Sequence, residues 1–169
     1  VISSGVVTTI AGTETFSSPA GITTDGTNLY VSEYNGGKIR RIVISSEEVS
    51  TLVDSTLISK PFSITTDNTN LYVADYINKK IFKIVISSSQ VSVLAGTTQQ
   101  EFDGIYGITT DGTNLYVADY SASKILKVVI SSGQVSVLAG PTGFTGPFGI
   151  GTDGTNLYVA DYSASKILK

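Results

Sequence analysis

The sequence contains no cysteine, no histidine, no methionine and no tryptophan. Without cysteine the chain forms no disulfide and has no thiolate chemistry. Without histidine it lacks the commonest general base and the commonest metal ligand. Charged residues make up only 15% of the 169 residues, and the net charge of −3 argues against a nucleic-acid partner, because such partners are usually bound by a basic surface. No apolar run approaches the ~20 residues of a membrane helix, so we expect no membrane insertion.

What the sequence has in abundance is one repeated segment. The stretch GITTDGTNLYVSEYNGGKIRRIVIS begins at Gly21, and close copies begin at Ser63, Gly107 and Gly149. A period of about 42 residues is typical of a four-stranded propeller blade. The alternation of apolar and polar residues, with β-branched residues between turns, predicts four short strands in each copy. In the third copy these strands are expected at 107–110, 114–119, 124–130 and 134–138.

Turn residues separate the expected strands. Asp-Gly pairs lie between the first and second strands of three copies, and the second copy has Asp67-Asn68 instead. Glycine and asparagine best tolerate a positive φ, so this exchange predicts a left-handed turn position. The turn aspartates are therefore assigned to structure rather than to a metal site: Asp25, Asp67, Asp111 and Asp153.

A single four-stranded sheet cannot bury both of its apolar faces, so the copies must stack as blades of a propeller or of an extended array. We predict one all-β domain over 1–169, with antiparallel blades at about 20–54, 62–96, 106–140 and 148–169. Residues 1–12 match the end of a blade, VISSGQVSVLAG at 129–140. They are expected to complete the last blade in the same chain, which closes a ring, or a blade of a neighbouring molecule, which leaves the stack open. In a further alternative, the chain is a window from a longer array of such repeats.

The run "GI-T-DG-NLYVADY---KI-K", followed by a strand ending in VLAG, resembles the NHL repeat in the form found in large secreted bacterial proteins. The resemblance implies a β-propeller that binds protein, carbohydrate or RNA, with a few lyase- or lactonase-like relatives. This chain differs from the RNA-binding members by lacking a basic surface, and from the metal-dependent enzymes by lacking histidine. We therefore expect no enzyme, no cofactor and no metal.

The resemblance and the repeat pattern together leave three functional hypotheses. The first is a non-catalytic scaffold or binding module of a secreted or cell-surface protein. The second is a structural subunit of an extracellular fibre, in which copies associate head to tail by strand completion. The third and least favoured is a lactonase- or lyase-like enzyme.

In NHL-type propellers the loops between second and third strands share one face with the connectors between blades. A protein or a carbohydrate is expected to bind the aromatic residues of that face. Tyrosine and phenylalanine offer a large contact area at a low entropic cost. The candidate residues are Tyr34, Tyr76, Tyr120, Tyr162, Phe16, Phe62, Phe102, Tyr106, Phe144 and Phe148. The alternative is that the four loop tyrosines fill gaps between blades while the preceding carboxylates bind loop backbone.

A basic residue opens each expected third strand. Lys80, Lys124 and their equivalents Lys38 and Lys166 are predicted to form surface ion pairs across the hairpin with Asp75 and its equivalents. The alternative is a stripe of positive charge that binds phosphate or an acidic polymer. Lysine at outer strands also discourages unwanted edge pairing.

Overall fold

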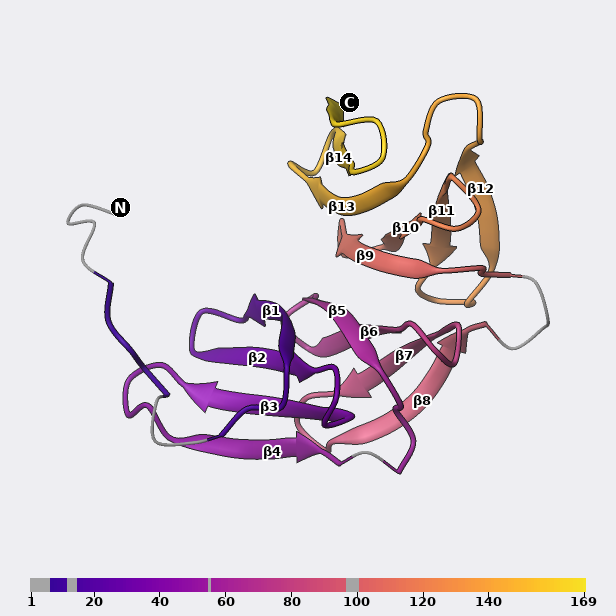
Figure 1. Ribbon diagram of the computed structural model, residues 1–169. Helices are drawn as coiled ribbons and strands as arrows, with labels where there is room; N and C mark the ends of the chain where they lie inside the picture. The colour runs from indigo at the N-terminus through magenta and orange to yellow at the C-terminus, as the bar shows by residue number, and fades with distance from the viewer. Residues whose placement is uncertain (1–6, 12–14, 55, 97–100) are drawn as a thin grey trace.

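The computed structural model describes residues 7–11, 15–54, 56–96 and 101–169, which form four antiparallel sheets (Figure 1). The first sheet contains β1 (Pro19–Thr24), β2 (Asn28–Glu33), β3 (Lys38–Val43) and β4 (Val49–Val53). The second contains β5 (Pro61–Thr66), β6 (Asn70–Asp75), β7 (Lys80–Val85) and β8 (Gln90–Ala95). The third contains β9 (Ile105–Thr110), β10 (Asn114–Asp119), β11 (Lys124–Val129) and β12 (Val135–Ala139). The fourth contains β13 (Pro147–Thr152), β14 (Leu157–Asp161) and β15 (Lys166–Leu168).

Each sheet is a meander in which every strand pairs with its neighbours in sequence. The four sheets are arranged as the blades of a β-propeller, which confirms the predicted all-β fold. The described ranges contain no helix, and therefore none that is long and apolar enough to cross a membrane.

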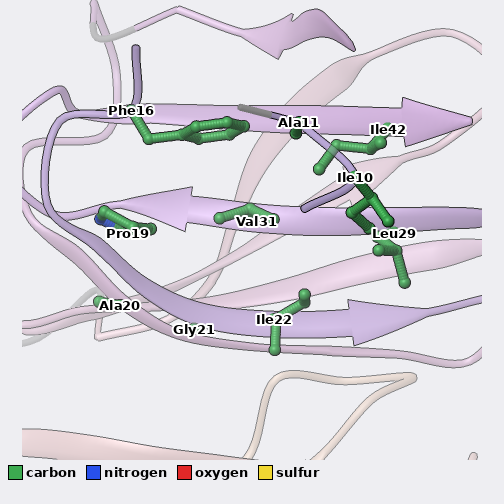
Figure 2. Close-up of a pocket in the computed structure, with 10 residues that line it drawn as sticks. All are labelled: Ile10, Ala11, Phe16, Pro19, Ala20, Gly21, Ile22, Leu29, Val31 and Ile42. Carbon is green, nitrogen blue, oxygen red and sulfur yellow. The ribbon is translucent and has the colours of Figure 1, made fainter. Parts of the chain in front are cut away.

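The fourth blade has three strands among the described residues. The predicted completing segment, 1–12, lies mostly outside the described residues, so blade completion stays a prediction. Its described part, 7–11, forms no strand. Ile10 and Ala11 lie instead beside the first blade (Figure 2).

The first strand of each blade lies on the inside of the array, and consecutive inner strands pack on each other: β1 on β5, β5 on β9, and β9 on β13. Small residues allow this approach. A Cβ atom added to Gly21 would lie 2.8 Å from the Phe62 carbonyl oxygen, and one added to Gly107 would overlap the Phe148 carbonyl oxygen. Glycine at these positions therefore lets the backbones of neighbouring blades touch.

The hydrophobic core consists of layers between consecutive blades. We call the side of a blade that faces the preceding blade its leading face, and the side that faces the following blade its trailing face. At the first junction, Tyr30 and Ile39 on the trailing face of the first blade pack on Ile64, Leu71 and Val73 on the leading face of the second.

The same layer recurs at the next two junctions. Ala74 and Ile81 pack on Leu115 and Val117 between the second and third blades. Ala118 and Ile125 pack with Val159 and its partly buried apolar neighbours between the third and fourth. Burial of both faces thus requires stacking, as the repeat predicted.

The predicted left-handed turns are present. The residue after each turn aspartate has positive φ, from 71° at Asn68 to 87° at Gly112. The hairpin between the third and fourth strands is similar, with positive φ at Glu47, Ser89 and Gly133. The second hairpin of each blade also has a left-handed residue, at Gly37, Lys79, Ser123 or Ser165. The sequence pattern did not indicate this third position, because serine and lysine are not typical of it.

Candidate functional site

The inner strands begin with a β-bulge that turns one side chain away from the sheet. Pairing of β5 with β6 shifts between Pro61 and Ser63, and pairing of β13 with β14 shifts between Pro147 and Gly149. The residue inside each shift is aromatic, Phe62 or Phe148, and Tyr106 has the equivalent place in β9. Bulges commonly redirect a side chain in this way.

The three bulge residues meet. Their ring centroids are 4.9 Å apart for Phe62 and Tyr106, 4.7 Å for Tyr106 and Phe148, and 5.6 Å for Phe62 and Phe148. Two of these contacts are edge-to-face and the third is stacked, which are the favoured geometries of aromatic pairs. Because the rings come from three different blades, the triangle exists only when the blades are stacked.

Four tyrosines surround this triangle, each directly after the end of a second strand. Tyr34 contacts Phe62 at 6.0 Å, and Tyr76 contacts Tyr106 at 5.0 Å. Tyr120 lies 6.4 Å from Phe148, and Tyr162 lies 6.0 Å from it. The first three tyrosines each contact the ring of the following blade, so they also fill gaps between blades, as the alternative interpretation predicted. We call these seven residues the aromatic cluster.

The aromatic cluster is accessible and uncharged. Six of its members are partly exposed, and Tyr162 is 73% exposed. A hydrogen bond with Tyr76, together with burial, raises the pKa of Tyr106 to about 12, so its hydroxyl stays neutral at ordinary pH. The Tyr120 and Ser163 hydroxyls are 3.0 Å apart, which links the third blade to the fourth.

Polar side chains lie at the border of the cluster. The Nζ atom of Lys60 lies 4.8 Å from the centre of the Tyr34 ring and donates a hydrogen bond to the side-chain Oδ1 atom of Asn35 at 2.9 Å. Lys60, Asn35 and Ser163 were not predicted as site residues, because they lie in variable positions of loops and no pattern marks them.

The carboxylates next to the cluster are buried and bind backbone. Asp119 accepts the backbone N–H groups of Asp103 (2.8 Å), Gly104 (2.9 Å) and Ala122 (3.2 Å). Asp75 and Asp161 bind their own connectors in the same way. These contacts hold the connector that carries the bulge residue, so the carboxylates position the cluster.

The prediction of ion pairs across the second hairpin was wrong for these aspartates. Lys80 lies opposite Asp75, and Lys124 lies opposite Asp119, but no ion pair joins either of these two pairs of described residues. The carboxylate oxygens are instead turned inward to the connector amides. In the first blade, where Glu33 replaces aspartate, the longer side chain reaches Arg40 at 3.3 Å.

Three of the predicted site residues do not join the cluster. Phe102 is 2% exposed and packs in the layer between the second and third blades. Phe144 packs in the next layer, and the Phe16 ring lies under the Arg40 guanidinium at 5.3 Å. They are separated from the cluster because they lie four residues before the bulge position. Phe102 and Phe144 point between blades, and Phe16 lines the hollow on the first blade. In the first blade the bulge position itself holds Ala20.

The turn aspartates have the predicted structural role. Asp25 accepts the backbone N–H groups of Thr27 (2.9 Å) and Asn28 (2.6 Å) and the Tyr30 hydroxyl (2.7 Å). Burial alone would raise the pKa of Asp25, but these hydrogen bonds outweigh it and lower the pKa to about 2. Burial and the same carboxylate raise the pKa of Tyr30 to about 12. All four aspartates repeat this arrangement.

Nothing in the described part of the chain resembles a metal centre, since no three carboxylates gather there. The described surface also has an apolar hollow of about 320 Å³ on the first blade (Figure 2). Ile10, Phe16, Ile22, Leu29 and Ile42 are among its lining residues.

No protein-family model matches the sequence, and no curated protein matches it. Several solved structures share its fold. A nidogen/laminin complex is 23% identical, with a TM-score of 0.75 over 89% of this chain and 62% of that one. Catalytically inactive virginiamycin B lyase from Staphylococcus aureus, with quinupristin, is 25% identical, with a TM-score of 0.74 over 89% and 51%. Hydrazine synthase of Kuenenia stuttgartiensis is 17% identical, with a TM-score of 0.67 over 100% and 51%.

These similarities confirm the β-propeller fold and do not name the NHL-repeat family, which stays a prediction. The chain spans 51% to 62% of the length of the three structures. The same fold therefore occurs in a structure of a protein complex and in enzymes, and it does not by itself select a function.

Proposed function

We propose that this chain is a non-catalytic binding propeller of a secreted or cell-surface protein, and that a protein partner binds the aromatic cluster. The observation that carries the proposal is the convergence of seven accessible rings from four blades at one end of the array. Aromatic residues surrounded by polar groups are typical of the energetically dominant centre of a protein interface.

A protein fits the cluster better than a carbohydrate does. Sugars stack on the open face of a ring, but Tyr106 and Phe148 are stacked on each other at 28° and cover one face of each ring. What remains accessible is an uneven surface of ring edges, which suits apolar side chains of a peptide or loop. Hydroxyl groups and Lys60 at its border supply hydrogen bonds.

Two observations favour binding over catalysis. The lyase with the same fold is described as inactive when one histidine is replaced by alanine, and this chain has no histidine. In addition, the buried carboxylates next to the cluster are saturated by backbone N–H groups, as in Asp119, and are not free for acid–base chemistry.

Selection of peptides from a random library on the immobilised full chain tests the proposal. Selected peptides are expected to bind the Tyr162→Ala variant about tenfold more weakly, because an aromatic ring that a partner buries commonly contributes more than 1 kcal/mol. Tyr158→Ala is the matched control, since Tyr158 is an exposed tyrosine of the same blade outside the cluster.

Equal binding to wild type and Tyr162→Ala would contradict this site. If no peptide is selected, the full chain can be applied to a glycan array. Binding there by the wild type but not by Tyr162→Ala would show that the cluster binds carbohydrate instead.

A further inference from the structure

The two end blades each leave one apolar face uncovered. On the leading face of the first blade, Ile22 is 63% exposed, whereas its equivalent in the second blade, Ile64, is 5% exposed. On the trailing face of the fourth blade, Ile167 is 75% exposed, whereas its equivalent in the third blade, Ile125, is 2% exposed. The exposure follows from position, because the same residue is buried wherever another blade is present.

The two uncovered faces are the two halves of an interface that the chain already forms. Residues 155–169 are identical to residues 113–127, whose trailing face binds the fourth blade. The leading face of the first blade carries Ile22, Leu29, Val31 and Ile42, and the second blade has the same four residue types at Ile64, Leu71, Val73 and Ile84. The hollow in Figure 2 lies on this leading face.

We propose that the trailing face of the fourth blade binds the leading face of the first blade in a second copy of the chain. This head-to-tail contact repeats the part of the contact between consecutive blades that the second and third strands of a blade make, since the described fourth blade has three strands. It closes into a ring of copies if the rotation between them allows, and otherwise grows into a filament.

The charged residue on the leading face is compatible with this contact. Arg40 stands where the second blade has Phe82 and the third has Leu126. Its guanidinium is neutralised by Glu33 at 3.3 Å and lies over the Phe16 ring, so no exposed charge opposes docking. Phe16 is equivalent to Ile58 of the second blade and Phe102 of the third. Both of those side chains are buried between two blades.

A second copy is favoured over an unrelated partner because of this match. An unrelated partner would need its own complementary surface, whereas a second copy brings a trailing face whose fit to such a leading face recurs at three junctions within the chain. The proposal does not rest on the aromatic cluster, although the two surfaces adjoin at Tyr162, which lines one hollow together with Phe148 and Ile167.

Sedimentation velocity of the full chain over a wide concentration range tests the proposal. The mass of the wild type is expected to increase with concentration. Ile22→Lys and Ile167→Lys should each weaken association by at least about tenfold, because each places a charge in an apolar interface. Both side chains are exposed in the single chain, so neither change threatens its folding. Ile77→Lys, in a loop of the second blade and 56% exposed, is the matched control.

Mixing the two variants distinguishes head-to-tail contact from other contacts. The Ile22→Lys chain keeps an intact trailing face, and the Ile167→Lys chain keeps an intact leading face, so the mixture should form a dimer that neither variant forms alone. A wild type that stays monomeric at every concentration would overturn the proposal. So would undiminished association of either variant, or a mixture that does not dimerise.

Discussion

The change in stability caused by Gly107→Ala, compared with that caused by Gly149→Ala, tests whether neighbouring inner strands touch through glycine. Both glycines have the same place in consecutive inner strands, and neither has a positive φ. A Cβ atom at Gly107 would overlap the Phe148 carbonyl oxygen and lie 3.2 Å from Ile150. At Gly149 the nearest atom would be the Ala160 Cβ at 3.6 Å, an ordinary contact.

The two variants should therefore differ in sign. At Gly107 the obstacle is backbone, which can move only if β9 separates from β13, and overpacking of this kind costs about 1–3 kcal/mol. At Gly149 alanine fits, and the loss of freedom in the unfolded chain should stabilise the protein by about 0.4–1 kcal/mol.

Urea unfolding at low protein concentration provides the measurement, with thermal unfolding in parallel. For a chain of this size, each kcal/mol corresponds to a change of about 2–4 °C in Tm. We expect Gly107→Ala to melt roughly 2–12 °C below the wild type and Gly149→Ala at or slightly above it. Equal stability of the two variants would refute the claim that neighbouring blades touch through glycine.

Three further predictions concern hydrogen bonds and turns. Asp119→Asn should destabilise the protein by about 1–3 kcal/mol, because one of the two carboxylate oxygens that accept the connector N–H groups is replaced by an amide NH₂, which cannot accept. Faster amide hydrogen exchange at Asp103 and Gly104 would report it, and unchanged exchange would contradict it. Hydrogen bonds outweigh burial and lower the pKa of Asp111 from its ordinary 3.8 to about 2. Its contribution to stability is therefore present above pH 4 and lost as the pH falls from about 4 to about 2. Asp111→Asn should reduce the slope of an acid titration followed by circular dichroism in that window, and an unaltered slope would argue against it. Gly112→Val should cost at least about 1–2 kcal/mol, because φ is 87° there. Gly112→Asn should cost less in the same thermal assay, since Asn68 already has this conformation, and the reverse order would be inconsistent with it.

The blades could be predicted from the sequence, because their strands, turns and stacking depend on local patterns. Alternation in segments such as NLYVAD predicts a strand, the Asp-Gly pairs predict the turn, and the repeat predicts the partner of each buried face. The structural interpretation of Asp25 and its equivalents was also correct, because an aspartate three or four residues before the second strand binds the turn backbone wherever the pattern recurs.

The site was only partly predictable, because it depends on a bulge. Phe102 and Tyr106 lie in the same connector, and composition does not distinguish them, yet one is buried between blades and the other points to the cluster. The difference arises from the register shift between β9 and β10 near Ala118, which leaves Tyr106 unpaired and turned outward. A bulge of this kind has no residue pattern of its own, so the sequence placed all connector aromatics on one face.

The bulge also shows whether the aromatic residues hold the backbone in place or form a surface on it. In the first blade, pairing shifts between Pro19 and Gly21 as it does in the other blades, although the residue inside the shift is Ala20. A ring is therefore not required to form the bulge or to hold the inner strand. The rings at Phe62, Tyr106 and Phe148 are additions to a backbone that forms without them, and together they make an accessible apolar surface. Their packing on one another preorganises that surface, which lowers the entropic cost of binding a partner.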